Sequence, residues 1–393
     1  RMAFQKEKPA ERSRLMYGRK DNNRISIKHI YIMYNDNRIV MTLDAGGTNL
    51  VFSAIRGGNE IVTPITLPSC ACNLEQCLGQ LATGFSRIRE QLTEAPVAIS
   101  FAFPGPADYS AGIIGNLPNF PSFRGGVALG PYLEEKFGIP VFINNDGDLF
   151  AYGEALTGAL PEVNLRLEKA GSIKRYKNLL GVTLGTGFGA GVVINGDLLM
   201  GDNAAGGDIW CFRNKKHQQY IVEESVSIRA VQHVYRELSS DTSALTPKDI
   251  FDIAEVTRPG NQDAARRAFA ELGEMAGDAI AQAITLIDGL VVIGGGLTGA
   301  AKYFMPALLE EMNSETGMMD GSRFSRLQSK AFNLDDEADF NRFARGEAVK
   351  IPVPGSDRQV DYDPCKRIGV MISKQGASRS VALGAYVYAL NHL

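Results

Sequence analysis

Two glycine-rich segments follow apolar runs that have the character of buried strands. Asp44-Ala45-Gly46-Gly47-Thr48-Asn49 follows residues 39–43, and Gly185-Thr186-Gly187-Phe188-Gly189 follows residues 179–184. Both are followed by further strand-like residues, so each segment predicts two strands joined by a tight turn. Glycine lets the backbone approach a ligand closely, and successive N–H groups can hold phosphate oxygens. The two turns are therefore candidate phosphate sites, although the first, taken alone, can also be a plain glycine hairpin.

The second turn imitates a dinucleotide-binding fingerprint, but that motif requires a helix after its glycines. Here residues 190–194, Ala-Gly-Val-Val-Ile, follow and favour a strand, which excludes dinucleotide binding. Gly294-Gly295-Gly296 ends another predicted strand and precedes a helix. In open α/β sheets ligands bind at such strand ends. The glycines would let a flat ring lie against the backbone, and a turn without function is the alternative.

A carboxylate closes a fourth predicted strand. Asn145-Asp146 follows the apolar residues 141–143 and precedes a predicted helix. A carboxylate in this position is a suitable general base, although a lone Asp there is more often a helix N-cap. Taken together, two phosphate turns, a glycine patch and a carboxylate indicate a phosphotransferase site that uses a nucleotide. Asp44, at the end of its strand, is a candidate for holding a Mg²⁺-bound water.

The elements around these residues form a repeated pattern. Each half of the chain begins with a strand, a glycine turn and a strand, which indicates a duplicated α/β fold with a cleft between the copies. We expect a basic, loosely ordered extension over 1–37, an N-terminal α/β domain over 38–150 and a C-terminal α/β domain over 151–377. The polar segment 315–362 is predicted to be an insertion, and a closing helix over 378–393 is expected to pack back on the first domain.

Composition narrows the class of protein. The chain has 393 residues, of which 45% are hydrophobic and 22% charged, as in globular proteins. Its net charge of -3 gives no overall signal for nucleic acid, and no apolar run approaches the ~18 residues of a membrane span. Five cysteines, an odd number, favour a reducing, cytoplasmic setting. The basic extension is either an arm for an anionic partner or an extension without a partner.

The set of motifs resembles the ROK family of sugar kinases, which have the actin-like (ribonuclease H-like) ATPase fold. Residues 43–49 resemble the family's first phosphate motif, and residues 184–191 resemble its second phosphate hairpin. Residues 143–146 with Gly153-Glu154 resemble its catalytic segment. Residues 104–119 resemble its sugar-side loop, and 293–297 its adenosine motif. The resemblance covers roughly residues 39–310 and the last helix.

The resemblance implies an enzyme that uses ATP and Mg²⁺ to phosphorylate a hexose. Asp146 would be the general base, taking a proton from a hydroxyl that is the 6-hydroxyl in the family, and glucose is the first choice of sugar. The implied sugar-binding residues are Gly105, Asn119, Asn145, Asp208 and Glu223. The implied ATP-binding residues are Asp44, Gly46, Gly47, Thr48, Gly185, Thr186, Gly187, Gly294, Gly295 and Gly296.

The chain departs from the family in one segment. Members typically carry Gly-Glu-x-Gly-His and then a cysteine cluster that binds structural zinc, whereas residues 205–213 here read Ala-Gly-Gly-Asp-Ile-Trp-Cys-Phe-Arg. Only Cys211 and His217 are close in sequence, and a zinc site needs about four ligands, so we predict no structural zinc. Asp208 is a candidate replacement for the missing glutamate. Trp210 can either stack on a sugar or be a structural aromatic.

Several alternatives stay open at this point. N-acetylglucosamine, N-acetylmannosamine, mannose and fructose are alternative substrates. A sugar-sensing regulator is the alternative class, and its members usually carry an N-terminal DNA-binding domain that is not recognisable here. A non-catalytic actin-like assembly protein is a third class, which the sugar-side residues disfavour. The family resemblance also implies a homodimer.

Overall fold

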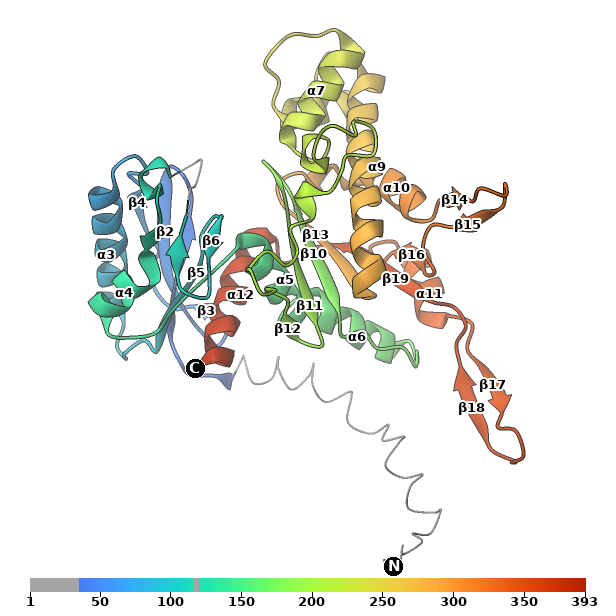
Figure 1. Ribbon diagram of the computed structural model, residues 1–393, viewed down its shortest axis with the longest axis horizontal. Coiled ribbons are helices and arrows are strands. Elements are labelled where there is room, and N and C mark those ends of the chain that lie inside the picture. Colours follow the sequence, from blue (N-terminus) through green and yellow to red (C-terminus); the bar gives the residue numbers. More distant parts are fainter. Residues whose placement is uncertain (1–34, 116–119) are drawn as a thin grey trace, which may run out of the picture.

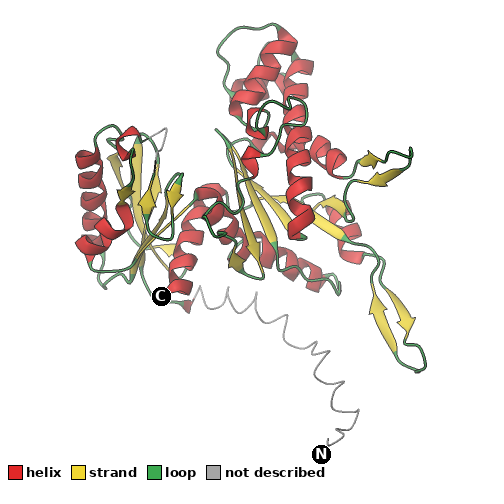
Figure 2. Cartoon of the chain, in the orientation of Figure 1, coloured by secondary structure: helices red, strands yellow, loops and turns green. Residues whose placement is uncertain are grey.

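The computed structural model describes residues 35–115 and 120–393 (Figure 1). Most of the predicted basic extension and the predicted sugar-binding residue Asn119 lie outside these ranges. The described chain contains two six-stranded sheets with helices on their faces (Figure 2). None of its described helices is both long and apolar enough to span a lipid bilayer.

The first sheet contains the first of the two glycine turns. Its strands run in the order β3-β2-β1-β5-β9, and β4 pairs with β2 beside β3. Alternation along β1 decides which face each side chain covers. Met41 and Leu43 pack with helices α3 and α4, whereas Val40 packs in the core that contains Tyr386 of α12. The elements are β1 (Val40–Ala45), β2 (Asn49–Arg56), β3 (Asn59–Glu60), β4 (Ile65–Pro68), α3 (Leu74–Gln91), β5 (Ala98–Ala102), α4 (Leu129–Phe137), β9 (Val141–Asn144) and α12 (Ala377–His392).

A small sheet extends this half of the molecule. It is formed by β6 (Ala107–Asp108), β7 (Ile113–Ile114) and β8 (Val127–Ala128), with the short 3-10 helix η1 (Pro121–Phe123) beside β8 in the chain. In the main sheet of this half, β3 and β4 are separate short strands that pair with different parts of β2.

The second sheet runs in the order β12-β11-β10-β13-β19-β16. Apolar residues on one face of β10, β13 and β19 pack with α7 to α10, and those on the other face pack with α5, α6 and α11. The elements are α5 (Asp146–Leu156), α6 (Ala159–Lys169), β10 (Leu179–Leu184), β11 (Phe188–Ile194), β12 (Asp197–Leu198), η2 (Ile209–Cys211), η3 (Val222–Glu224), α7 (Ile228–Ser239), α8 (Pro247–Ala254), α9 (Gln262–Ile287), β13 (Leu290–Gly294), η4 (Thr298–Ala300), α10 (Ala301–Met312), β16 (Lys330–Asn333), α11 (Glu337–Arg345) and β19 (Arg367–Ile372).

Helices α5 and α12 lie between the two sheets (Figure 1). Helix α5 packs against β10 and β11 of the second sheet, and α12 packs against β1 and β5 of the first. The two helices cross at Gly153 and Gly384. A Cβ atom on Gly384 would lie 2.0 Å from the Leu149 carbonyl oxygen, and one on Gly153 would lie 2.0 Å from that of Ser380. The helices therefore touch backbone to backbone where they cross.

The prediction that the whole segment 315–362 is an insertion is wrong for its central part. Strand β16 pairs in parallel with β19, so it is an edge strand of the second sheet. Helix α11 follows it and buries Phe340 and Phe343. Only the two hairpins, β14 (Glu315–Gly317) with β15 (Arg323–Ser325) and β17 (Val349–Pro352) with β18 (Gln359–Tyr362), project from the body (Figure 1). The buried aromatics of this segment are spaced for one helix face, which a reading of overall polarity missed.

Candidate active site

The first glycine turn joins β1 to β2 and is open to solvent. Asp44, Gly46, Gly47 and Thr48 are all exposed. The Gly46 N–H bonds across the turn to the Asn49 carbonyl oxygen, at 2.9 Å. Within the described residues, the N–H groups of Gly47 and Thr48 have no hydrogen-bond partner. They are two successive donors available for an anion.

Ser69 fixes this turn from behind. Its hydroxyl donates to the Gly47 carbonyl oxygen at 2.6 Å, and its N–H donates to the Thr48 carbonyl oxygen at 2.9 Å. Ser69 is buried, so these bonds are protected from water. Ser69 therefore holds the two carbonyl groups of the turn whose N–H groups have no partner among the described residues.

The second glycine turn joins β10 to β11 and also contains two successive N–H groups without a described partner. The Gly185 N–H bonds to the Gly187 carbonyl oxygen at 3.1 Å, whereas the N–H groups of Thr186 and Gly187 have no partner among the residues described. Here the support is ionic. The Glu223 carboxylate accepts from the Phe188 N–H at 3.0 Å and from the Arg229 guanidinium at 3.0 Å. Arg229 also donates to the Thr186 carbonyl oxygen.

The three glycines after β13 have different surroundings. A Cβ on Gly294 would lie 2.6 Å from the Phe150 ring, and one on Gly295 would lie 2.3 Å from the Leu184 carbonyl oxygen. Gly295 also has a φ of +96°, which favours glycine. Gly296 is exposed and has open space where a side chain would be. Gly294 and Gly295 are thus explained by packing, and Gly296 is the one of the three beside free space.

Asp146 is the first residue of α5, and Asn145 is its N-cap. The Asn145 side-chain oxygen accepts from the Gly147 N–H at 2.8 Å, which is the capping role that a lone Asp could have had. Asp146 is exposed to solvent, but surrounding protein atoms partly desolvate its carboxylate. Desolvation raises the pKa of Asp146, the Gly147 N–H opposes this, and the charge of Asp44 raises the pKa further. The ends of β1 and β9 therefore bring two carboxylates into electrostatic contact.

Helix α5 also connects Asp146 to the second turn. A Cβ on Gly147 would lie 2.5 Å from the Ala190 carbonyl oxygen, and Ala190 is in β11, which begins at Phe188. Only glycine permits this approach of the helix to the strand. Asp146 is thus close to Asp44 of the first turn and also close to β11, the strand that follows the second turn.

The sequence analysis missed two residues beside Asp146. The Tyr109 hydroxyl donates to the Phe103 carbonyl oxygen at 3.0 Å and accepts from the Asn145 side-chain amide at 3.3 Å. Burial raises the pKa of Tyr109, and the charges of Asp146, Asp148 and Asp208 act in the same direction. Asp148, two residues after Asp146, is buried. No spacing marked Tyr109, whereas a second Asp in the first turn of α5 was a signal for Asp148.

Of the predicted sugar-binding residues, the structure brings together Gly105, Asn145 and Asp208. A Cβ on Gly105 would lie 3.0 Å from the Tyr109 hydroxyl oxygen, and the charge of Asp208 acts on both Tyr109 and Asp148. Glu223 instead lies against the second turn, paired with Arg229. Trp210, near the position of the missing family histidine, has a relative exposure of 39%.

The carboxylate oxygens of Asp44 suit a hard cation. Carboxylate oxygens and water are the ligands that Mg²⁺ prefers, usually with phosphate oxygens of the substrate. Asp44 is exposed beside the free N–H groups of the first turn. Among residues 35–115 and 120–393, no three His, Cys, Asp or Glu side chains are grouped so that they could hold a metal by themselves. A metal here would therefore need the phosphate oxygens as well as Asp44.

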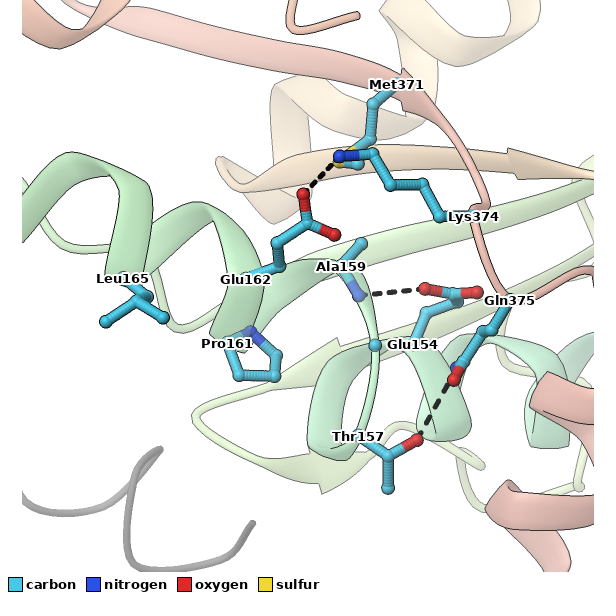
Figure 3. A pocket seen from close by; sticks show the side chains of 10 residues that line it. Glu154, Thr157, Ala159, Pro161, Glu162, Leu165, Met371, Lys374 and Gln375 are labelled. Atoms are coloured by element: carbon cyan, nitrogen blue, oxygen red, sulfur yellow. Dashed lines mark hydrogen bonds and ion pairs between the residues drawn. The ribbon is translucent and has the colours of Figure 1, made fainter.

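A separate hollow of about 320 Å³ lies at the other end of α5 (Figure 3). Its lining includes Glu154, which is buried and accepts from the Ala159 N–H at 2.8 Å. Glu154 also accepts from the hydroxyl groups of Ser373 and Ser380. One carboxylate therefore ties the end of α5 to the start of α6, the segment after β19 and the first turns of α12. Both of its carboxylate oxygens accept hydrogen bonds from the protein, which is the pattern of a structural group.

Comparisons with known proteins give the family. The model of the ROK family matches residues 40–319. The glucokinase of Halalkalibacterium halodurans is 26% identical over 320 residues, which are 73% of this chain and 90% of the relative. The crystal structure of glucokinase from Parabacteroides distasonis ATCC 8503 is 71% identical, covers 92% of this chain and 100% of its own, and has a TM-score of 0.87.

A more distant structure bears on the fold alone. The ROK hexokinase from Thermus thermophilus is 21% identical, covers 90% of this chain and 99% of its own, and has a TM-score of 0.63. The predicted fold class, two α/β domains of the actin-like ATPase kind, is confirmed by these structural neighbours and by the two sheets. The family model matches well over half of the chain, and the chain therefore belongs to the ROK family.

Proposed function

We propose that this protein is an ATP:hexose phosphotransferase that phosphorylates glucose on its 6-hydroxyl group. The observation that carries the proposal is the position of Asp146. Its carboxylate lies beside Asp44 at the first turn and next to the strand that leaves the second turn. Each turn offers two successive N–H groups without a partner among the described residues. The site thus combines a base with two anion-binding loops.

The reaction needs one proton acceptor and much positioning. The Asp146 carboxylate accepts the proton of the sugar hydroxyl as that oxygen forms a bond to the γ-phosphorus of ATP. The bond from the γ-phosphorus to the oxygen that bridges to the β-phosphate breaks, and ADP leaves with that oxygen. The N–H groups of the two turns hold phosphate oxygens, because such transfer depends mainly on position and charge stabilisation. The raised pKa of Asp146 makes its carboxylate a stronger base.

Mg²⁺, when bound with ATP, neutralises charge on the phosphate oxygens. Asp44 would hold it through a water molecule, and the exposed position of that carboxylate suits this role. Gly296 would lie against the adenosine, since it is the glycine with free space. Asn145 and Asp208 would bind sugar hydroxyl groups. Asn119 is proposed for the same role on the family resemblance, and Glu223 would join them from η3.

The choice of glucose rests on the relatives. The two named glucokinases align over most or all of their own length, and one of them is 71% identical to this chain. N-acetylglucosamine kinases are among the more distant relatives, at 25% identity over 281 residues for that of Haemophilus influenzae. The nearer similarity favours glucose over the acetylated sugars. A homodimer and a cytoplasmic location are further proposals on family resemblance, and light scattering would test the first.

Coupled ADP release would test the assignment. Wild type and Asp146→Asn would be assayed with Mg²⁺-ATP and glucose, N-acetylglucosamine, N-acetylmannosamine, mannose or fructose. We expect the highest kcat/KM with glucose. Loss of a general base costs about 10²–10⁴-fold, so kcat of Asp146→Asn should fall by at least that, with glucose binding largely retained in calorimetry. Near-normal turnover of the variant would contradict the role of Asp146. Glucose binding without turnover of any sugar by wild type would instead favour a sugar-sensing regulator.

A further inference from the structure

Three carboxyl groups meet where α5 begins. Asp146 and Asp148 are in its first turn, and Asp208 is in the loop that precedes η2. Both segments pack on Gly191 of β11. A Cβ on Gly191 would lie 2.7 Å from the Asp148 Cα, and a Cβ on Gly207 would lie 3.5 Å from the Gly191 Cα. The absence of side chains at these glycines is what brings Asp148 and Asp208 to the same place.

Asp148 is the most enclosed of the three. Its relative exposure is 5%, whereas Asp146 and Asp208 are both exposed. The buried Oδ1 atom of Asp148 has no hydrogen-bond partner among the described residues. A buried polar atom without a partner is costly, so in a functional site it indicates a group that receives its partner from a ligand or from a proton.

The groups that face Asp148 supply no positive charge. They are Asp146 from its own helix, Asp208 from the loop before η2, Tyr109 from the first half of the molecule and Tyr388 from α12. Gly191, which contacts it from β11, is not titratable. Within the part of the chain that the structure describes, no group of side chains around it could hold a metal ion either.

Neighbouring carboxylates without a counter-ion disfavour one another's ionisation. Asp148 is the buried member of the three, and so the one whose charge water stabilises least. Burial, followed by the charges of Asp208 and Asp146, raises the pKa of Asp148 to about 8. Environments that separate neighbouring carboxyl groups in this way assign one as acid and another as base.

We propose that Asp148 is a positioning residue at the sugar end of the site, where it holds a proton and offers its O–H as a hydrogen-bond donor beside the acceptor Asp208. The proposal rests on the kinase function proposed above. A sugar hydroxyl placed there would accept from Asp148 and donate to Asp208. Asp146 would then remain the ionised group that takes the proton of the reacting hydroxyl.

The pH dependence of catalysis separates this role from a structural one. Asp148→Asn keeps the size and a donor but cannot ionise. At pH 7 we expect its sugar KM to lie within about threefold of the wild-type value, since a neutral donor is retained. Wild type should lose affinity for the sugar between pH 7 and pH 9, as Asp148 ionises, and Asp148→Asn should not. Asp148→Ala, which has no donor, should raise the sugar KM about tenfold or more at pH 7.

Two outcomes would overturn the proposal. One is a set of superimposable pH profiles for wild type and Asp148→Asn. The other is a loss of kcat in Asp148→Asn as large as that in Asp146→Asn, which would mean that Asp148 must be ionised. A measurement that does not need activity covers the case of a poorly active variant. Wild type at pH 7 should show the infrared carbonyl band of a protonated carboxylic acid, and this band should be absent from Asp148→Asn.

The infrared result also separates this proposal from the proposed function. A wild-type band that persists unchanged in Asp148→Asn would overturn the proton on Asp148 even in an active kinase. Wild type without turnover of any sugar would overturn the proposed function, while loss of the band in the variant would still support the proton. Thermal unfolding is a third readout. A carboxyl group whose pKa is higher in the folded state makes the folded protein less stable as it ionises at rising pH. Between pH 5 and pH 9 the Tm of wild type should therefore fall relative to the Tm of Asp148→Asn.

Discussion

The two glycine turns share a backbone solution but differ in charge. In both, the first residue of the turn donates a hydrogen bond across it, and the next two N–H groups have no partner among the described residues. The first turn spans four residues between the last paired residues Ala45 and Leu50, and the second spans three between Leu184 and Phe188. The two turns also differ at the residue before the last paired residue of the incoming strand. That residue is Asp44 in β1 and Thr183 in β10.

The supports of the turns differ in the same way. Ser69, a neutral group, holds the first turn through two carbonyl oxygens, whereas the ion pair of Glu223 and Arg229 holds the second. The local geometry of an anion site can therefore be repeated while its electrostatics diverge. A carboxylate at the first turn suits a metal ion, and a guanidinium at the second suits phosphate oxygens directly. This difference gives the turns separate roles in the proposed reaction, and substitutions can test it.

Removing the carboxylate of the first turn should have the largest effect. We expect Asp44→Asn to lower kcat roughly a hundredfold, because a misplaced metal and phosphate cost about that much. Thr183→Val, at the corresponding position of the second turn, is the matched control and should change kcat far less. Steady-state assays over a range of Mg²⁺ concentrations would compare them. Equal effects of the two substitutions would remove the proposed asymmetry.

The same variant should alter the pH profile. The charge of Asp44 raises the pKa of Asp146, so Asp44→Asn should lower that pKa. Since the base must be ionised, the acid limb of the kcat profile should move to lower pH in the variant. An unmoved or raised limb would show that the two carboxylates do not interact during catalysis.

Crowding the second turn should have a smaller effect, on stability. A Cβ on Gly187 would lie 2.5 Å from the Glu223 carboxylate, while one on Gly185 would meet nothing within 4 Å. Gly187→Ala should therefore lower the free energy of unfolding by about 1–3 kcal/mol, the usual cost of overpacking. Gly185→Ala is the control and should have little effect on stability. Urea titrations of the two variants would decide, and equal losses would mean that Glu223 moves freely.

The two supports should respond differently to salt, and this is the smallest effect. Ser69→Ala should cost about 1 kcal/mol of stability, since it removes one protected hydrogen bond. Arg229→Met should cost less, about 0–1 kcal/mol, because its partly exposed ion pairs are screened. Raising the salt concentration should reduce the cost of Arg229→Met and leave that of Ser69→Ala unchanged. A salt-dependent cost at Ser69 would contradict the distinction between the supports.

Strand alternation and glycine turns made much of the fold predictable. The strand predicted over residues 179–184 was found with those bounds, and both predicted strand–turn–strand units are present. Other placements were not predictable. Helix α7 starts only at Ile228, and residues 222–224 before it form a 3-10 turn that places Glu223 on the second glycine turn. That placement depends on Arg229 and Phe188, which a local pattern does not contain.

The candidate site was predictable where it lies at the ends of strands. Asp44, Asp146 and the glycine turns could be proposed because a strand end is visible in the sequence as the end of an apolar run, and the structure places them at or next to the ends of β1, β9, β10 and β13. Tyr109 and Ser69 were missed, since their contacts with Asn145 and Gly47 join residues far apart in the chain. Asp148 was passed over for a different reason. A second Asp in the first turn of α5 was visible in the sequence, but its burial and the nearby charge of Asp208 depend on tertiary contacts.

The crossing of α5 and α12 has a consequence for the order in which the molecule is assembled during synthesis. Residues 377–392 cover one face of β1 and β5, strands that leave the ribosome much earlier. At ~5–20 residues per second, roughly 10–50 s separate Asn144 from Ala377. During that interval the first sheet has an uncovered apolar face, which is the kind of surface that chaperones recognise. The half of the protein that is translated first is thus the half that is completed last.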